Sequence, residues 1–87
     1  MYTVMLLPVV EKTLAKIRDR KVRAQLIQLI DELAETPRPH GYKKLSGHAN
    51  LYRVRQGDWR VSYAIKDDQL IVLVIEVATR GNAYRDL

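Results

Sequence analysis

The chain has 87 residues, enough for one small domain, and this length excludes a multidomain enzyme, a large barrel or a full dinucleotide-binding fold. Apolar residues make up 47% of the sequence and charged residues 29%, as in folded proteins rather than disordered ones. Cysteine is absent, which excludes disulfides and thiolate sites. The sequence has neither a membrane-length apolar stretch nor a signal-peptide pattern, so we expect a single domain over residues 1–87, located in the cytoplasm and independent of membranes.

The net charge of +5 comes from the middle of the chain. Residues 38–60 contain six basic side chains and one acidic side chain, whereas basic and acidic residues nearly balance in the segments before and after. A concentrated basic segment favours a polyanionic partner, most commonly a nucleic acid. The alternative is a solvated loop with scattered lysines.

Apolar periodicity predicts the elements of the first half of the chain. Residues 2–7 form a short apolar run typical of a strand, and Pro8 suits the first turn of a helix. Apolar residues spaced by three and four predict helices over residues 8–18 and 21–35, with Asp19 as the N-cap of the second. Because the break is short, the two should form a helical hairpin.

The next segment, residues 36–50, is rich in proline and glycine and is predicted to be a loop. It contains His40 and His48, which lack companions at metal-ligand spacing. We interpret them as polar surface residues and expect no metal site there.

Three strands are predicted in the second half, over residues 51–55, 59–66 and 70–78. The dipeptides Gln56-Gly57 and Asp67-Asp68 are turn sequences that would connect them as an antiparallel meander. The predicted fold is therefore α+β: an N-terminal strand, a helical hairpin and a three-stranded antiparallel meander, with the helices on one face of the sheet. The position of the first strand in the sheet is left open.

Arginines cluster on one face of this predicted meander. A Gln56-Gly57 turn would set Arg55 opposite Asp58 and Arg53 opposite Arg60. Facing like charges destabilise a sheet by several tenths of a kcal/mol, on the order of magnitude known for cross-strand pairs. Since arginine binds phosphate oxygens in pairs and stays charged, the cluster favours an anion site. The alternative is that these arginines extend into water or pair with a distant carboxylate.

Three further residues of the strands have more than one interpretation. Trp59 and Tyr52 have rings that can stack on bases, but strand aromatics more often belong to the core, so we assign Trp59 to the core and leave Tyr52 undecided. Glu76 is either a general base or, in the interpretation we favour, the partner of a basic neighbour.

In element order and length the chain resembles the RelE/ParE superfamily of bacterial and archaeal toxins. Each matching motif is short, and their combination is specific. The motifs are Lys44-Leu45, Tyr52-Arg53-Val54-Arg55, Gly57-Asp58-Trp59-Arg60-Val61, Tyr63, Val74 to Val77, and Arg80 followed by Tyr84.

Members that resemble RelE are ribosome-dependent messenger-RNA endonucleases, so the resemblance implies attack of a ribose 2′-hydroxyl on the adjacent phosphate in the ribosomal A site, without metal or other cofactor. It implies partnership with the ribosome, mRNA and a cognate antitoxin, the last in a hetero-oligomer. The catalytic residues it implies are Arg53, Arg55, Arg60, Arg80 and Tyr84. The residues expected to bind RNA or the ribosome are Arg38, Lys43, Lys44 and Arg85.

The proton-transfer groups of this implied reaction stay open. Many relatives have histidine before the C-terminal arginine, where this chain has Thr79. Arginine is a poor base, which leaves Tyr84 or a loop residue such as His48.

Two other functions remain as alternatives. One is a ParE-like inhibitor of DNA gyrase with the same fold and no RNA cleavage, although such members generally lack the full basic constellation. The other is an RNA-binding module without catalysis.

Overall fold

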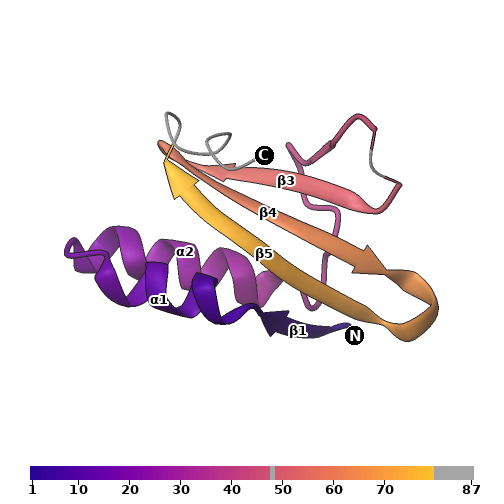
Figure 1. Ribbon diagram of the computed structural model, residues 1–87, viewed down its shortest axis with the longest axis horizontal. Coiled ribbons are helices and arrows are strands. Elements are labelled where there is room, and N and C mark those ends of the chain that lie inside the picture. The colour runs from indigo at the N-terminus through magenta and orange to yellow at the C-terminus, as the bar shows by residue number, and fades with distance from the viewer. Residues whose placement is uncertain (48, 80–87) are drawn as a thin grey trace.

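The structure, a computed structural model, describes residues 1–47 and 49–79. It is an α+β fold in which two helices cover one face of a five-stranded sheet (Figure 1). The elements, in chain order, are β1 (Thr3–Leu6), α1 (Pro8–Lys16), α2 (Arg20–Glu32), β2 (Lys43–Lys44), β3 (Leu51–Gln56), β4 (Trp59–Lys66), a 3-10 turn (Asp67–Gln69) and β5 (Ile71–Thr79). This confirms the predicted fold class and element order.

The helical hairpin begins and turns where the sequence predicts. Pro8 occupies the first turn of α1, where its missing N–H costs no hydrogen bond. Asp19 caps α2, since its carboxylate accepts hydrogen bonds from the backbone N–H groups of Lys21 at 2.9 Å and Val22 at 3.2 Å. Both helices end two or three residues earlier than predicted. None of the helices in the described residues is long and apolar enough to cross a membrane.

The sheet has the order β1-β5-β4-β3-β2. Strands β3, β4 and β5 form the predicted antiparallel meander, and β1 pairs in parallel with β5, which settles the position that the sequence left open. The loop prediction for residues 36–50 was wrong at Lys43–Lys44, because these two residues form β2 by pairing with β3.

One of the two predicted turn dipeptides was wrong by one residue, whereas the other, Asp67-Asp68, lies in the observed connection between β4 and β5. Gln56 pairs with Trp59, so the β3–β4 turn is Gly57-Asp58, and Gly57 takes the left-handed φ of 60° that its first central position requires. The β4–β5 connection is the 3-10 turn, closed by Leu70 at φ 54°, so β5 begins at Ile71 rather than Leu70.

The core lies between the helices and one face of the sheet. The helices contribute Val10, Leu14, Ile17, Leu26, Ile30 and Leu33, and the strands contribute Tyr52, Val54, Val61, Tyr63, Ile65, Val72, Val74 and Val77. Tyr52 is thus a core residue. Trp59 is only half-buried, packing against the core from its edge, so its assignment to the core was correct in part. The alternate residues of β3 and β4 project to the face without helices.

Candidate nucleic-acid interface

The face of the sheet without helices brings three predicted site residues together. Arg55 stands directly opposite Arg60 across the β3–β4 ladder, and Arg53 stands opposite Ser62. The predicted pairing of Arg53 with Arg60 was therefore wrong: the turn lies one residue later in the chain, which shifts the register of the two strands by two residues. Because this shift of the turn preserves side-chain parity, all three arginines still share one face, with Arg53 and Arg60 diagonal neighbours about 7–8 Å apart at Cα. We call these three residues the arginine face.

The neighbouring strands extend this face on both sides. Lys43 of β2 pairs with Arg53, and on the other side Ser62 pairs with Glu76 of β5. One row across the sheet is therefore Lys43, Arg53, Ser62 and Glu76, and the next row is Arg55, Arg60 and Ala78. Lys43 and Arg55 are exposed, Arg53, Arg60 and Glu76 are half-buried, and the Ser62 side chain is buried.

An irregularity in the ladder places Glu76 in this row. Tyr63 pairs with Val74 while Ser62 pairs with Glu76, so Ile75 is an extra residue on β5. Without this bulge Glu76 would pair with Val61 and point into the core, and Val77 would point outward. The bulge reverses both, burying Val77 and bringing a carboxylate to the arginine face.

A phase change in the sequence signals this bulge. The buried residues of β5 are Val72, Val74 and Val77, so the alternation slips by one between Val74 and Val77. The nearly all-apolar composition of the strand hides the slip when the sequence is considered alone.

The structure does not bring Arg38 to this face. Its guanidinium forms an ion pair with Asp67 at 2.9 Å, donates a hydrogen bond to the Tyr52 hydroxyl at 3.4 Å, and lies over the Tyr52 ring at 5.2 Å from the centroid. Tyr52 belongs to the core face. Arg38 is therefore bound within the fold at the other end of the β3–β4 ladder.

Asp67 and the tyrosines complete a polar and aromatic cluster around Arg38. Tyr63 stacks on Tyr52 at 6.0 Å and donates a hydrogen bond to the Pro37 carbonyl at 2.8 Å. We call Arg38, Tyr52, Tyr63 and Asp67 the tyrosine end. Hydrogen bonds from Arg38 and then Tyr2 lower the pKa of Asp67, and the hydrogen bond to Asp67 is the main cause that raises the pKa of Arg38. Burial raises the pKa of Tyr63 to about 12.

The other predicted site residues fall into two groups. Lys44 is exposed and pairs with Tyr52, so it shares the core-side parity rather than that of the arginine face. Arg80, Tyr84, Arg85 and His48 lie outside the described residues.

Comparison with known proteins identifies the family. Residues 4–84 match the family model of the ParE toxin of the type II toxin–antitoxin system parDE. The RelE1 protein of Methanocaldococcus jannaschii is 34% identical over 62 residues, covering 68% of this chain and 69% of the relative.

Solved structures agree in fold. RelE in the archaeal RelE–RelB complex of Pyrococcus horikoshii superposes with a TM-score of 0.81 at 28% identity, covering 94% of this chain and 98% of that chain. In the intact RelBE toxin–antitoxin complex of E. coli, the matching chain gives 0.77 at 27% identity, covering 91% and 96%. The chain therefore belongs to the ParE toxin family of type II toxin–antitoxin systems, in the RelE-like branch of the RelE/ParE superfamily.

Proposed function

We propose that this toxin is a ribosome-dependent endoribonuclease that cleaves messenger RNA at the A site. The observation that carries the proposal is the arrangement of the arginine face, where Arg55 stands opposite Arg60 and Arg53 lies diagonal to Arg60. Such a concentration of guanidinium groups on the face of the sheet without helices opposes stability and suits a phosphate. The similarity to RelE chains supports the same assignment.

In the proposed reaction the substrate supplies its own nucleophile. The ribose 2′-oxygen forms a bond to the adjacent phosphorus while the bond from phosphorus to the 5′-oxygen breaks, leaving a 2′,3′-cyclic phosphate and a free 5′-hydroxyl. Negative charge grows on the phosphate oxygens as the new bond forms. Arg53, Arg55 and Arg60 would stabilise this charge, which is often the largest contribution to catalysis.

Two protons also move in this reaction. The 2′-hydroxyl loses one and the 5′-oxygen gains one, so a base and an acid are required. Among the described residues, Glu76 places a carboxylate on the same side of the sheet as the arginine face, and it is one candidate for the base. Tyr84 and His48 remain candidates from the sequence, and Arg80 remains a candidate for phosphate binding.

The predicted RNA- and ribosome-binding residues divide in the same way. Lys43 extends the arginine face, and exposed Lys44 lies beside it in β2. We propose both, with Arg85, as RNA- or ribosome-binding residues. Because Arg38 is already held by Asp67 and Tyr52, we assign it a structural role instead.

Substitution of Arg60 tests the proposal most directly. In single-turnover cleavage of mRNA on programmed ribosomes, Arg60→Ala should lower the rate by about a hundredfold or more, the scale of a lost transition-state donor. Arg60→Lys should recover only part of the rate, because lysine lacks the planar two-point contact. Ribosome affinity should fall much less than the rate.

Lys66→Ala is the control, since Lys66 is an exposed cation at the end of β4 that lies away from the β3–β4 turn. It should cleave within about twofold of the wild-type rate, the range expected for a remote surface change. A folded Arg60→Ala protein that cleaves at the wild-type rate would show that the arginine face is a binding surface without catalytic function.

We propose a cognate antitoxin as the protein partner. The matched RelE chains of Pyrococcus horikoshii and E. coli come from complexes with RelB. A segment that covers the arginine face would block the phosphate site, so the cognate antitoxin should suppress cleavage in the same ribosome assay.

Inhibition of DNA gyrase is the second candidate, because the matching family model is that of the ParE toxin. The two functions give different products after brief induction in cells. Cuts within translated codons support the ribonuclease, whereas DNA damage without RNA cuts supports gyrase inhibition. Absence of both would indicate RNA binding without catalysis.

A further inference from the structure

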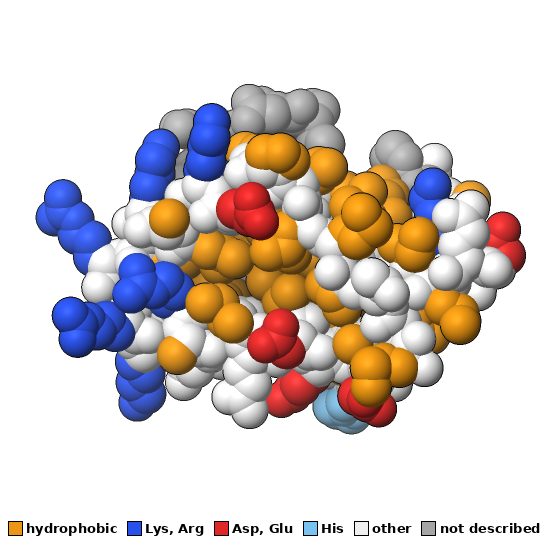
Figure 2. Space-filling view, turned by 90° about the horizontal axis from the view of Figure 1, so that it is seen from below, with side chains coloured by type: hydrophobic (Ala, Val, Ile, Leu, Met, Phe, Trp, Pro, Cys, Tyr) orange, Lys and Arg blue, Asp and Glu red, His pale blue; other side chains and the backbone are white. Residues whose placement is uncertain are grey.

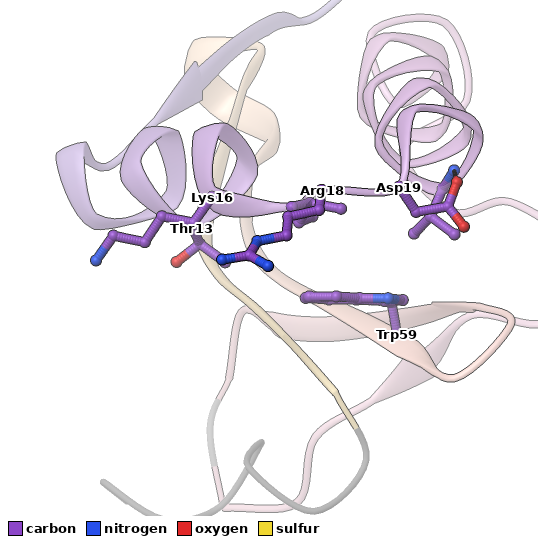
Figure 3. Close-up of a pocket in the computed structure, with 7 residues that line it drawn as sticks. Thr13, Lys16, Arg18, Asp19 and Trp59 are labelled. Carbon is purple, nitrogen blue, oxygen red and sulfur yellow. Dashed lines mark hydrogen bonds between the residues drawn. The ribbon is translucent and has the colours of Figure 1, made fainter.

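An open pocket of about 450 Å³ lies beside the indole of Trp59, a volume within the usual range for small-ligand sites. It is lined by Thr13, Lys16, Ile17, Arg18, Asp19, Val22 and Trp59. Figure 3 shows the indole edge-on below the α1–α2 connection, with the side chains of Lys16 and Arg18 extending to the same side of the pocket. Arg18 thus lies in this connection, whereas the sequence predicts it at the end of the first helix.

The pocket combines a flat apolar surface with nearby cations. Trp59 is half-buried although it is the largest side chain of the sheet, and its exposed part lines the pocket. Lys16 and Arg18 are both exposed at its rim. Between residues 12 and 23 the chain has six basic side chains and one acidic side chain, and Figure 2 shows the basic groups gathered at this end of the helical layer.

This end of the molecule also contains one end of the arginine face. The β3–β4 turn and the α1–α2 connection lie at the same end of the fold (Figure 1). Trp59 and Arg60 are consecutive in β4, so their Cα atoms are about 3.8 Å apart while their side chains project to opposite faces of the sheet. A flexible strand that contacted both Arg60 and the Trp59 pocket would pass around the end of β3 and β4.

We infer that this pocket binds one nucleotide of a single-stranded RNA, with the base stacked on the Trp59 indole and the flanking phosphates near Lys16 and Arg18. Exposed cations beside an aromatic face are the combination used for single strands, where each base offers a stacking surface and each linkage a negative charge. The inference rests on the proposed function in one respect, namely that RNA is the substrate. It adds a binding subsite on the helix side of the sheet, away from the reacting phosphate.

Trp59 is the single tryptophan of the chain, so its fluorescence reports on the pocket directly. The probe is a short 2′-O-methyl RNA oligonucleotide, which cannot be cleaved by 2′-oxygen attack, titrated into the full chain without ribosomes. Stacking should quench the fluorescence. An oligonucleotide of the same length with abasic sites should bind at least fivefold more weakly and leave the emission nearly unchanged, given the known contribution of stacking per base.

Charge reversal at the pocket rim distinguishes RNA binding in this pocket from non-specific electrostatic attraction between RNA and a basic protein. The variant Lys16→Glu/Arg18→Glu should weaken quenching about tenfold or more, and the pair Lys12→Glu/Lys21→Glu, with the same change in net charge but outside the pocket lining, should weaken it by threefold or less. All four residues are exposed, so the variants should fold, which their melting curves will check.

Equal quenching by the abasic strand, or equal weakening by both charge-reversal pairs, would overturn the inference. So would quenching by the cognate antitoxin together with none by RNA, since the pocket would then be a protein-binding site. Failure of the proposed function is distinguishable, because loss of the cleavage result for Arg60→Ala would leave this ribosome-free quenching unaffected.

Discussion

The two ends of the β3–β4 ladder use arginine in opposite ways. At the tyrosine end, Arg38 forms an ion pair with Asp67, donates to Tyr52 and covers the Tyr52 ring. At the turn end, the ladder sets Arg55 opposite Arg60. One arrangement places a cation among groups that stabilise it, and the other places two cations across from each other.

This difference separates an arginine held by a carboxylate and an aromatic ring from arginines that the sheet gathers on one face. A cross-strand pair of like charges opposes folding, so its presence in a small domain points to selection for binding or catalysis. The tyrosine end connects the residue before β1, the segment after α2 and the β4–β5 connection through Tyr2, Pro37 and Asp67. We therefore expect changes at the tyrosine end to alter stability, and changes at the arginine face to alter cleavage.

The largest stability effect expected at the tyrosine end belongs to Tyr63. Its side chain is fully buried, and its folded-state pKa of about 12 exceeds the unfolded value of about 10. The neutral hydroxyl therefore contributes fully to the stability of the fold below pH 10, and this contribution, about 3 kcal/mol in total, is lost as the pH rises from 10 to 12. Tyr63→Phe should remove this pH dependence.

Urea unfolding of both proteins from pH 8 to 12 measures the difference. At pH 8 the variant should be less stable by about 1 kcal/mol, because it lacks the hydrogen bond to the Pro37 carbonyl. Wild type should lose more stability than the variant above pH 10. Stability curves that run parallel over this range would show that Tyr63 does not contribute in this way.

Arg38→Ala gives the direct contrast to Arg60→Ala. The variant loses the ion pair and the contact with Tyr52, and its melting temperature should fall by a few degrees while its cleavage rate on ribosomes stays near that of wild type. Because Arg38 lowers the pKa of Asp67, the pair stabilises the fold above the unfolded pKa near 4 and loses this contribution as the pH falls through the lowered folded value. The difference in melting temperature between wild type and Arg38→Ala should therefore become smaller at acid pH. A loss of cleavage comparable to that of Arg60→Ala would place Arg38 in RNA binding after all.

The sequence predicts which face of the sheet a side chain occupies better than it predicts which residue lies opposite it on the next strand. Alternation along β3 and β4 is enough to place Arg53, Arg55 and Arg60 on one face, because a shift of the turn that keeps the pairing parity leaves that face unchanged. Alternation alone does not show which arginines lie opposite each other, since both Gln56-Gly57 and Gly57-Asp58 are plausible turn dipeptides.

Contacts between distant segments were beyond prediction from a single sequence. The partnership of Arg38 with Asp67 joins positions 29 residues apart, and no local pattern marks it. Charge counting therefore assigned Arg38 to the basic segment, although its contacts belong to the core side. In the same way, the net charge of the first 37 residues hides the basic cluster of residues 12–23, because the acidic residues later in α2 cancel it in the sum. A net charge ignores where each charged side chain lies along a helix.

The smallest expected effect is a gain in stability at the arginine face. Arg55 is exposed and opposite Arg60, so Arg55→Thr removes one like-charge pair and introduces a residue that favours strands. The free energy of unfolding should rise by a few tenths of a kcal/mol, on the scale of cross-strand pairs, and the gain should shrink in high salt as screening weakens the repulsion.

Lys66→Thr is the control, because Lys66 is an exposed cation of β4 and the residue opposite it on β5 is the apolar Ile71. Chemical denaturation at low and high salt compares the two. A gain for Arg55→Thr that exceeds the control at low salt, together with slower cleavage on ribosomes, is the result expected of a residue retained for function at a cost in stability. A variant no more stable than its control would mean that Arg55 and Arg60 do not repel each other in the folded toxin, and the physical argument for an anion site on this face would then rest on Arg53 and Lys43 alone.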